Sequence, residues 1–373
     1  MIIKRLCIQN FRNIRHLELM PDMINVIYGP NGCGKTSVLE SISSLALGRT
    51  FRSTKNTHLI NYKSQDFLLT AQIERDDQLI TDTVGMKRSR SRTVPLQISI
   101  NGHHSNKLID VVDKLCTQII HPQGGELITG TPEERRNFLD WGVYYSYPEF
   151  KKLWMQYKKL IEQRNALLKN RINVQQVQIT LACWDEMIAQ ISEKITKLRQ
   201  NYLEEIHPEL EKITTKFLPG IHFDFTLSKG WPDDTELQHL LSLNFEKDRN
   251  LGYTFYGCHR ADLKIKVNQY PASETLSRGQ SKLLVCAMRL SQGTVLSKQT
   301  HKNCIYLVDD INSELDQHSM ALLIEEILSS RNQLFITNIT SDIKFPKGNK
   351  INLINMQEQL QCSECKDISS SAQ

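Results

Sequence analysis

The sequence lacks long apolar runs, and this absence argues against the commonest membrane and secreted classes. No stretch among its 373 residues approaches the roughly 18 consecutive apolar residues that a membrane-spanning helix needs. Residues 1–6, MIIKRL, do not form the apolar core of a secretory signal peptide. We therefore expect a protein of the cytoplasm.

The nine cysteines form neither a disulfide framework nor a complete zinc site. Most stand inside apolar runs, as Cys286 and Cys304 do, and such cysteines serve as small core residues in a reducing compartment. Cys362 and Cys365 have CxxC spacing, but a structural zinc site needs four ligands and no second CxxC or histidine pair supplies the rest. The sequence therefore does not favour a structural metal site.

Strong net charge is missing as well. The net charge of +5 permits a polyanionic partner without requiring one. No aromatic series resembles the stacking platform of single-strand binding proteins. The hydrophobic fraction of 40% is enough for one large core or two compact units. Composition thus leaves the function open, and the motifs have to decide it.

A glycine-rich loop follows a strand pattern at residues 23–28 and precedes a helix pattern at residues 37–47. Its sequence, GPNGCGKT, fits GxxxxGK[ST], in which backbone N–H groups surround phosphate oxygens. Lys35 would bring a positive charge to the outer phosphates, and the Thr36 hydroxyl would bind Mg²⁺. The candidate nucleotide-binding residues here are Gly29, Pro30, Asn31, Gly32, Cys33, Gly34, Lys35, Thr36 and Ser37.

An acidic pair follows the short apolar strand pattern at residues 305–308. Asp309 would hold the Mg²⁺, and Asp310 would orient or deprotonate the attacking water. An acidic pair after a strand can also be a helix N-cap. The phosphate-binding loop elsewhere in the chain favours the catalytic interpretation.

Residues 276–280, LSRGQ, precede a helix pattern at residues 281–290 and look like the ABC signature motif. A serine hydroxyl, a glycine N–H and a helix N-terminus suit the γ-phosphate of a nucleotide held by a second subunit. The candidates are Ser277, Gly279 and Gln280; the alternative is a serine N-cap with a turn glycine.

Three further segments bear on ATP hydrolysis. Residues 313–316, SELD, look like a D-loop, which usually lies at a dimer interface. Residues 122–125 look like a Q-loop, in which Gln123 would sense Mg²⁺ and the attacking water, with Gln118 as the alternative. The strand at residues 334–337 is followed by Asn338, where many ABC proteins have a switch histidine. This difference argues against a transporter-type ATPase and indicates slow hydrolysis.

A helical segment interrupts the α/β pattern. Apolar residues recur at helical spacing in residues 150–168 and again in residues 184–198, which predicts two antiparallel helices joined near residues 171–178. They form either a projecting coiled-coil arm or an ordinary helical subdomain. Strand patterns return at residues 253–256 and 263–267.

The fold class that follows is α/β, an ABC-type P-loop ATPase head with a mixed sheet, flanking helices and an antiparallel lobe, interrupted by an α-helical arm. Asn101 and Gly102 mark a hairpin turn within the lobe. The expected domains are residues 1–131 and 219–360 for the two parts of the head, 132–218 for the arm and 361–373 for a polar tail.

Taken together, the motifs resemble the RecF family of ABC/SMC-type ATPases over nearly the whole chain. The supporting blocks, besides the motifs above, are QNFRNI at 9–14, GRTFRS at 48–53, ERRNFLDWG at 134–142 and QRNALL at 163–168. The last two are the most specific to the family.

The resemblance implies an ATP-binding and Mg²⁺-binding protein that dimerises on ATP, binds DNA and hydrolyses ATP slowly. It also implies that Arg12 contacts the nucleotide. Family members act at single-strand gaps and stalled forks with the partners RecO and RecR, help to load recombinase and support SOS induction. A nucleotide-binding subunit of another ABC/SMC-type assembly and a non-enzymatic DNA-binding scaffold are the rival interpretations.

The residues themselves give less support for DNA binding. A basic cluster at residues 87–92 is expected in a loop, and both arm helices carry lysines and arginines. They suit backbone phosphates, or equally form solvated faces. The helix residues are Lys151, Lys152, Lys158, Lys159, Lys169, Lys194, Lys197 and Arg199.

Overall fold

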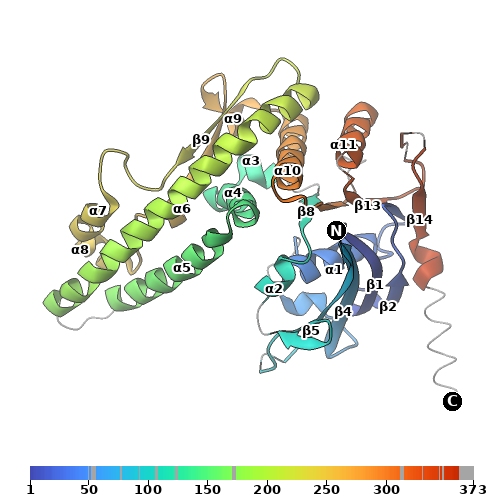
Figure 1. Cartoon of the computed structure of the whole chain (residues 1–373), viewed down its shortest axis with the longest axis horizontal. Helices are drawn as coiled ribbons and strands as arrows, with labels where there is room; N and C mark the ends of the chain where they lie inside the picture. The colour runs from blue at the N-terminus through green and yellow to red at the C-terminus, as the bar shows by residue number, and fades with distance from the viewer. Residues whose placement is uncertain are drawn as a thin grey trace. The chain divides into compact units, whose positions relative to one another are not determined.

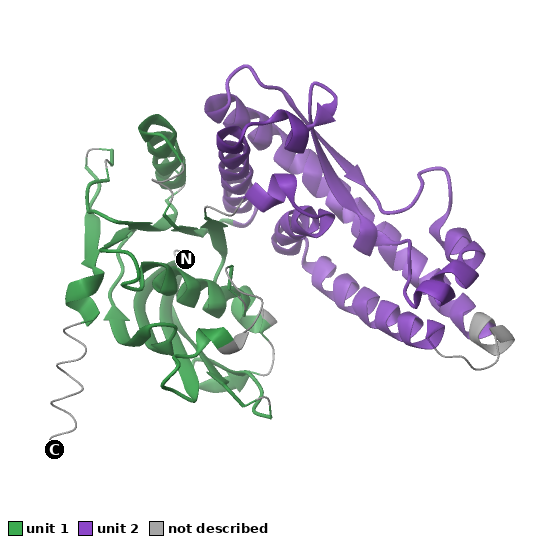
Figure 2. Cartoon of the chain, turned by 180° about the vertical axis from the view of Figure 1, so that it is seen from behind, with its two compact units in different colours: residues 1–124, 301–373 green, residues 125–300 purple. Residues whose placement is uncertain are grey.

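The computed structural model describes residues 1–48, 50–51, 56–75, 78–91, 93–105, 108–121, 125–169, 174–310, 315–329, 331–343, 345–346 and 348–360. The chain forms two compact units, one of residues 1–124 with 301–373 and the other of residues 125–300 (Figures 1 and 2). None of the helices in the described ranges combines the length and apolar composition that a membrane crossing requires.

The first unit contains a parallel sheet with the strand order β14-β3-β13-β12-β8. Its strands β3, β8, β12 and β13 are mostly apolar and buried, as expected of strands covered on both faces, whereas the edge strand β14 is largely half-exposed. The strands are β3 (Ile24–Tyr28), β8 (Thr117–Ile120), β12 (Ile305–Val308), β13 (Gln333–Asn338) and β14 (Ile351–Asn355). The helices of this unit include α1 (Lys35–Leu47), η1 (Asn56–Leu59), α2 (Ile109–Val112) and α11 (Gln317–Ser329), and residues 356–360 are also helical.

A six-stranded sheet with the order β2-β1-β4-β5-β6-β7 forms the antiparallel lobe of the same unit. Its strands are β1 (Ile2–Phe11), β2 (Ile14–Leu19), β4 (Asp66–Arg75), β5 (Gln78–Ser89), β6 (Gln97–Ile100) and β7 (His103–Ser105). The turn between β6 and β7 has Asn101 and Gly102 at φ of 52° and 81°, which confirms the predicted hairpin.

The second unit consists mainly of helices around a small sheet with the order β11-β10-β9. Its longer helices are α4 (Pro132–Ser146), α5 (Pro148–Leu168), α6 (Val174–Phe217) and α10 (Arg278–Thr300). The shorter elements are α3 (Glu126–Thr129), β9 (Phe223–Ser228), α7 (Leu237–Leu243), α8 (Phe245–Leu251), η3 (Cys258–Arg260), β10 (Asp262–Val267), β11 (Tyr270–Pro271) and α9 (Ala272–Thr275).

The helices α5 and α6 lie side by side in both views, as the apolar periodicity predicts (Figures 1 and 2). Arg164 of the QRNALL block is fully buried and donates to Asp185 at 2.7 Å and to Asp248 at 2.6 Å. These charged hydrogen bonds connect α5 to α6 and α8. One of the two most specific sequence blocks therefore has a structural role in the arm.

The ERRNFLDWG block is structural as well. The guanidinium of Arg199 on α6 is fully buried and forms a bidentate pair with Asp140 on α4, at 2.7 and 2.9 Å. A side chain at Gly142 would overlap the ring of Tyr202, so the glycine permits close helix packing. Arg199 was expected on the exposed basic face of the arm, and this prediction is wrong because a partner carboxylate allows its burial.

Two other expectations are also wrong. Residues 253–256 do not form a strand, because side chains satisfy their backbone N–H groups: Asn165 accepts from Thr254 at 2.8 Å and Asp248 accepts from Phe255 at 3.0 Å. The basic cluster at residues 87–92 is not simply a loop, since β5 extends to Ser89 and Lys87 forms an ion pair with Asp66 across the strands. Arg92 lies outside the described residues.

The two compact units divide the chain differently from the four expected domains. Residues 219–300, which were expected in the ATPase head, group with the helices in the second unit. The expected boundaries at 131, 218 and 360 remain a prediction about functional domains. The tail at residues 361–373, with Cys362 and Cys365, lies outside the described residues.

Candidate nucleotide-binding site

The glycine-rich loop joins the end of β3 to the start of α1. Its chain reverses through Gly29, Gly32 and Gly34, whose φ values are 143°, 83° and 100°, in the region that favours glycine. A Cβ on Gly34 would lie only 3.2 Å from the side-chain amide of Asn13. The helix ends at Gly48, which adopts the left-handed conformation and donates to the carbonyl of Ser44. The predicted strand, loop and helix are thus all present.

Lys35 is the first residue of α1, and its side chain reaches back to this loop. It is 7% exposed, and its ammonium group donates to the carbonyls of Gly29 at 2.7 Å and Pro30 at 3.0 Å. An ammonium group has three donors and no acceptor, so its contacts here are all with electron-rich oxygen. The loop therefore fixes a positive charge where phosphate oxygens can meet it.

A hydroxyl and a carboxylate meet beside the loop. Thr36 donates to Oδ1 of Asp309 at 2.9 Å, and Thr337 donates to the same oxygen at 2.8 Å. Carboxylate and hydroxyl oxygens are hard donors of the kind that Mg²⁺ prefers. Among the described residues, no group of three His, Cys, Asp or Glu side chains could hold a metal ion. A cation bound by Thr36 and Asp309 would therefore need other ligands, such as phosphate oxygens, water or a residue outside the described ranges.

The strand order explains why these residues meet. β13 lies between β3 and β12 in the parallel sheet, so the carboxyl ends of all three strands open to one edge. Thr337 stands near the end of β13, and its hydroxyl accepts from the N–H of Asp310 at 2.8 Å. Asp310 has a φ of 40°, which is unusual for a residue other than glycine, and this bond holds it there.

A cavity of about 890 Å³ opens over the loop. Its walls include Lys35, Thr36, Ser37 and Asp310, together with Arg12 from the turn after β1. Its volume is in the range usual for small-molecule sites, and most of its lining residues are polar or charged. The other lining residues are Asn13, Asn31, Gly32, Gly34, Glu40, His58, Ile60, Tyr62 and Thr337.

Arg12 is held in place by a carboxylate. Its guanidinium forms a bidentate pair with Glu40 of α1 at 3.0 and 2.7 Å, and Glu40 also accepts from Thr50 at 2.8 Å. Glu40 is 2% exposed. Arg12 itself has a φ of 54°, and its N–H donates to the carbonyl of Leu59 at 2.7 Å. The pair brings a fixed guanidinium to the wall of the cavity.

The signature segment lies in the second unit, at the start of α10. The N–H of Ser277 donates to the side chain of Gln280 at 2.9 Å, and the N–H of Gln280 donates to the Ser277 hydroxyl at 3.2 Å. This reciprocal pair is a capping box, in which Ser277 is the N-cap of α10. Ser277 and Gly279 are exposed, and the helix N-terminus faces solvent there.

The comparisons with known proteins identify the family. Residues 2–362 match the model of the RecF/RecN/SMC N terminal domain. The chain is 39% identical over 343 residues to the DNA replication and repair protein RecF of Vibrio atlanticus (strain LGP32), covering 92% of this chain and 94% of the relative. It is also 39% identical over 341 residues to RecF of Pasteurella multocida (strain Pm70), covering 91% and 93%. The chain belongs to the RecF family.

Solved RecF structures share the fold. The recombination mediator protein RecF-ATP in the RecFOR pathway matches with a TM-score of 0.84 and 25% identity over 95% of each chain. RecF-ATPrS of the same pathway gives 0.81 and 25% identity, over 95% of this chain and 96% of that one. An SmcHead bound to the C-winged helix domain of ScpA gives 0.54 with 14% identity, over 91% and 90%. The predicted ABC-type ATPase fold with its helical insertion is therefore confirmed.

Some predicted site residues of this RecF-family chain lie away from the cavity or outside the described residues. Gln123, Ser313 and Glu314 are outside the described residues. Gln118 is a buried residue of β8 and does not line the cavity. Asp316 caps α11 by accepting from the N–H of Ser319 at 2.8 Å, and this hydrogen bond lowers the pKa of Asp316.

The sequence analysis missed three residues of the site: Asn13, Glu40 and Thr337. Asn13 donates to the carbonyl of Gly32 at 2.9 Å and accepts from Ser37 at 2.8 Å. Asn13 lies within the QNFRNI block and Glu40 follows the glycine-rich loop, but the sequence does not show which of these neighbouring residues contact the site. Thr337 becomes visible only once β13 is known to lie between β3 and β12.

Proposed function

We propose that this chain is an ATP-dependent DNA-binding protein of recombinational repair and replication-fork recovery in the cytoplasm. Its substrate DNA is single-stranded or gapped duplex. It closes into a homodimer on ATP, hydrolyses ATP slowly with stimulation by DNA, and helps recombinase loading and SOS induction together with RecO and RecR. The RecF-family relatives and the ATP-bound RecF structure support this assignment.

The observation that carries the proposal is the arrangement of Lys35, Thr36 and Asp309 at one edge of the parallel sheet. The loop N–H groups and Lys35 bind the outer phosphates of ATP. When bound, Mg²⁺ neutralises charge on the β- and γ-phosphates, and Thr36 and Asp309 are the residues that hold it, with Gln123 as a further ligand. Arg12 contributes a second positive charge from the cavity wall.

Hydrolysis depends on Asp310. Its carboxylate orients the attacking water and accepts a proton from it, while Thr337 fixes the Asp310 backbone. Gln123 supports the same water. Slow hydrolysis fits the sequence at the end of β13, where Asn338 takes the place of a switch histidine. The side-chain amide of Asn338 donates a hydrogen bond to the carbonyl of Thr340 at 2.8 Å.

Dimer formation uses the signature of a second copy. Exposed Ser277 and Gly279, with half-buried Gln280, lie at the start of α10 and form a ready site for the γ-phosphate bound by the partner copy's loop. To reach phosphate, the Ser277 hydroxyl gives up only the weak 3.2 Å hydrogen bond from Gln280. ATP thus bridges two copies, and hydrolysis separates them.

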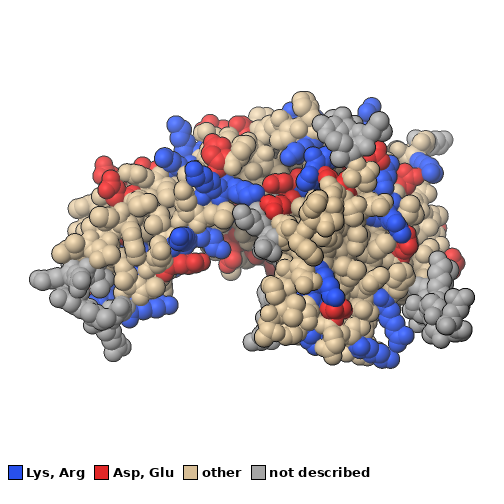
Figure 3. All heavy atoms as spheres, turned by 60° about the horizontal axis from the view of Figure 1, so that its bottom comes forward, with Lys and Arg blue, Asp and Glu red and all other residues tan. Residues whose placement is uncertain are grey.

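DNA binding in this account is electrostatic. Lys152, Lys158, Lys159 and Lys194 are exposed on α5 and α6 and suit backbone phosphates. Figure 3 shows lysine and arginine side chains interspersed with acidic ones over the face in view. Contacts of this kind do not depend on the base sequence of the DNA, and the affinity for DNA should fall steeply as the salt concentration rises.

The proposal predicts that Lys35→Met weakens ATP binding roughly ten- to hundredfold, because charge-assisted hydrogen bonds to phosphate contribute about 1.5–3 kcal/mol. Titration with a fluorescent ATP analogue measures the effect. ATP-dependent retention on gapped DNA should be lost in the same variant. Lys212→Met, on an exposed part of α6 and outside the lysines proposed to bind DNA, is the matched control and should bind ATP and gapped DNA as the wild type does. Unchanged ATP binding by Lys35→Met would remove the basis of the proposal.

A further inference from the structure

A groove in the second unit runs along one side of α6, beside β9 and the loop of residues 229–236. It consists of two cavities of about 570 and 520 Å³, which share Gln200 and Glu204 as lining residues. The α6 residues that line it lie between Glu193 and Pro208 and recur at spacings of three and four, so they occupy one face of the helix. The proposed ATP site does not use this groove.

The groove follows an open strand edge. Phe225, Thr226 and Leu227 of β9 all line the second cavity. Because neighbouring residues of a strand point to opposite faces, three consecutive residues can line one cavity only along the edge of the strand. Within the described residues β9 pairs only with β10, so its other edge has backbone groups available for another strand.

The charge of the groove is opposite to that of the whole chain. The chain carries a net charge of +5, whereas five carboxylates and two ammonium groups line the larger cavity. Lys229 is already engaged, since it lies 3.5 Å from a carboxylate oxygen of Asp233 and over the ring of Trp231. The carboxylates are Glu193, Glu204, Asp233, Asp234 and Glu236.

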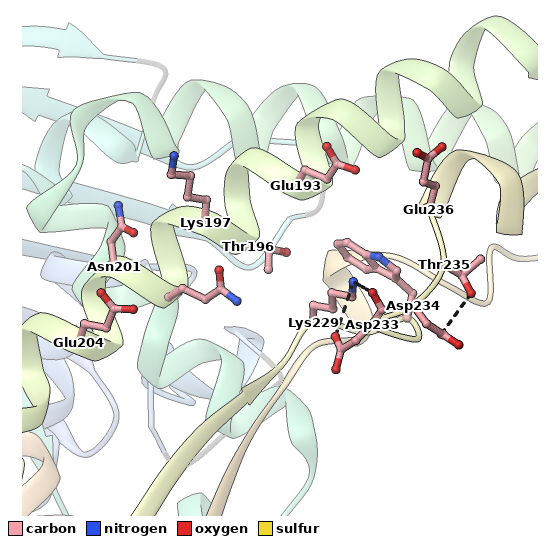
Figure 4. Close-up of a pocket in the computed structure, with 12 residues that line it drawn as sticks. Glu193, Thr196, Lys197, Asn201, Glu204, Lys229, Asp233, Asp234, Thr235 and Glu236 are labelled. Atoms are coloured by element: carbon pink, nitrogen blue, oxygen red, sulfur yellow. Dashed lines mark hydrogen bonds and ion pairs between the residues drawn. The ribbon is translucent and has the colours of Figure 1, made fainter.

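A buried hydroxyl points to a ligand. Thr196 is 6% exposed and lines the larger cavity, and its hydroxyl has no hydrogen-bond partner in the described part of the chain. Figure 4 shows this hydroxyl between α6 and the 229–236 loop, directed into the cavity. A buried hydroxyl without a partner is costly, and a polar group from a bound segment would satisfy it.

We propose that this groove binds an extended basic segment of a partner protein, which pairs with β9 as an added strand. Alternate side chains of the segment pack on the apolar part of the groove, formed by Leu203, Pro208, Phe225 and Leu227. Its arginine or lysine side chains meet the carboxylates near Glu193 and Glu204, and the Thr196 hydroxyl gains a partner. The carboxylates repel nucleic acid, so this surface is for protein and not for DNA.

The test uses two short fluorescein-labelled peptides, one of alternating arginine and valine and one of alternating glutamate and valine. Fluorescence anisotropy with the full chain should show binding of the arginine peptide only. Glu193→Lys with Glu204→Lys should weaken it at least about tenfold, because two attractive charges become repulsive. Glu186→Lys with Glu211→Lys makes the same charge change on exposed α6 positions outside the groove and should leave binding unchanged.

Hydrogen exchange tests the added strand. The arginine peptide should slow amide exchange in β9, at residues 223–228, and not in β11 at the opposite edge of the sheet. Equal binding of both peptides, unchanged binding by the Glu193→Lys/Glu204→Lys variant, or protection elsewhere would overturn the proposal. Slower amide exchange in β9 on addition of a single-stranded oligonucleotide without peptide would assign the groove to DNA. If the wild type dimerises without peptide and the Glu193→Lys/Glu204→Lys variant does not, the groove binds a second copy; either result also overturns the proposal.

Discussion

At the scale of single residues, the position of Arg12 depends on Glu40, a residue that no motif singled out. Glu40 is nearly fully buried, so its charge is stabilised mainly by the guanidinium and by the Thr50 hydroxyl. If Arg12 contacts ATP as proposed, the carboxylate acts on ATP binding by keeping the guanidinium at the cavity wall. Glu40 is a positioning residue in this account.

Glu40→Gln should weaken ATP binding about tenfold, or about 1.4 kcal/mol, because the amide keeps the shape of the carboxylate but not its bidentate charged pair with Arg12. ATP titration measures the change. Glu18→Gln is the control, since Glu18 pairs with Arg5 at 2.6 Å on the exposed surface and such pairs contribute little. If Arg12→Ala loses affinity and Glu40→Gln does not, Glu40 has no positioning role.

A second prediction concerns His259. Burial lowers its pKa to about 4 from an ordinary value of 6.5. Tyr157 lies 2.6 Å from its Nδ1 and the carbonyl of Thr254 lies 3.1 Å from its Nε2, an arrangement that suits a neutral ring protonated on Nε2. Between pH 6.5 and 4 the unfolded chain therefore binds a proton that the folded chain does not.

The stabilisation that His259 gives is complete above pH 6.5 and is lost as the pH falls towards 4. Its full size is on the order of 3 kcal/mol. Urea unfolding at a series of pH values gives the free energy of unfolding as a function of pH. Between pH 4 and 6.5 this free energy should rise more steeply with pH in the wild type than in His259→Gln. Parallel pH profiles for the two proteins would show that the histidine titrates normally in the folded state.

The glycine-rich loop and the acidic pair could be predicted from the sequence because each is a local pattern with a defined chemical purpose. Thr337 could not, because its role depends on which strands are neighbours. Arg199 was misjudged for a related reason: its spacing on α6 fits an exposed face, and only the carboxylate of Asp140 explains its burial.

At the scale of elements, the arm combines its apolar stripe with a buried charge network centred on Arg164. The guanidinium connects three helices through Asp185 and Asp248, and Thr254 adds a further hydrogen bond at 3.0 Å. Burial raises the pKa of Asp185 despite the opposing effect of Arg164. Without Arg164, the buried Asp185 carboxylate would therefore destabilise the fold. An apolar cluster of Leu168, Leu181 and Phe245 packs in the same region.

Arg164→Met should destabilise the fold by about 3–5 kcal/mol, because two buried carboxylates lose their cation. Urea unfolding of the variant and the wild type gives the difference. Lys158→Met, on the exposed side of the same helix, should change the unfolding free energy by less than about 0.5 kcal/mol. A loss below about 1 kcal/mol for Arg164→Met would mean that apolar packing alone holds the arm.

The helices of the arm were predictable because their apolar residues recur over many turns. The segment at residues 253–256 was not, since its aromatic and β-branched residues suit a strand while two of its N–H groups bond to side chains, Asn165 far away in the sequence and Asp248 on the preceding helix. Strand β14, at residues 351–355, was also missed, because its exposed Leu353 and flanking polar residues hide the pattern.

At the scale of the whole molecule, the glycine-rich loop belongs to the first compact unit and the signature to the second. In the proposed mechanism, the loop of the first unit binds the ATP phosphates and the signature of the second unit binds the γ-phosphate. The two halves come from different copies in that mechanism, so ATP controls assembly. Ser277 is the residue at which this idea can be tested with the least disturbance, because it is exposed and caps a helix.

Light scattering in the presence of Mg·ATP, on wild type, Ser277→Asp and Ser277→Asn, is the most direct test. Both replacements keep an N-cap acceptor for α10, but only aspartate places a negative charge where the partner's γ-phosphate would lie. We expect the wild type and Ser277→Asn to double in mass with ATP and Ser277→Asp to stay a monomer that still binds ATP. Dimerisation of Ser277→Asp like the wild type, or a wild type that stays monomeric when saturated with ATP, would contradict the account.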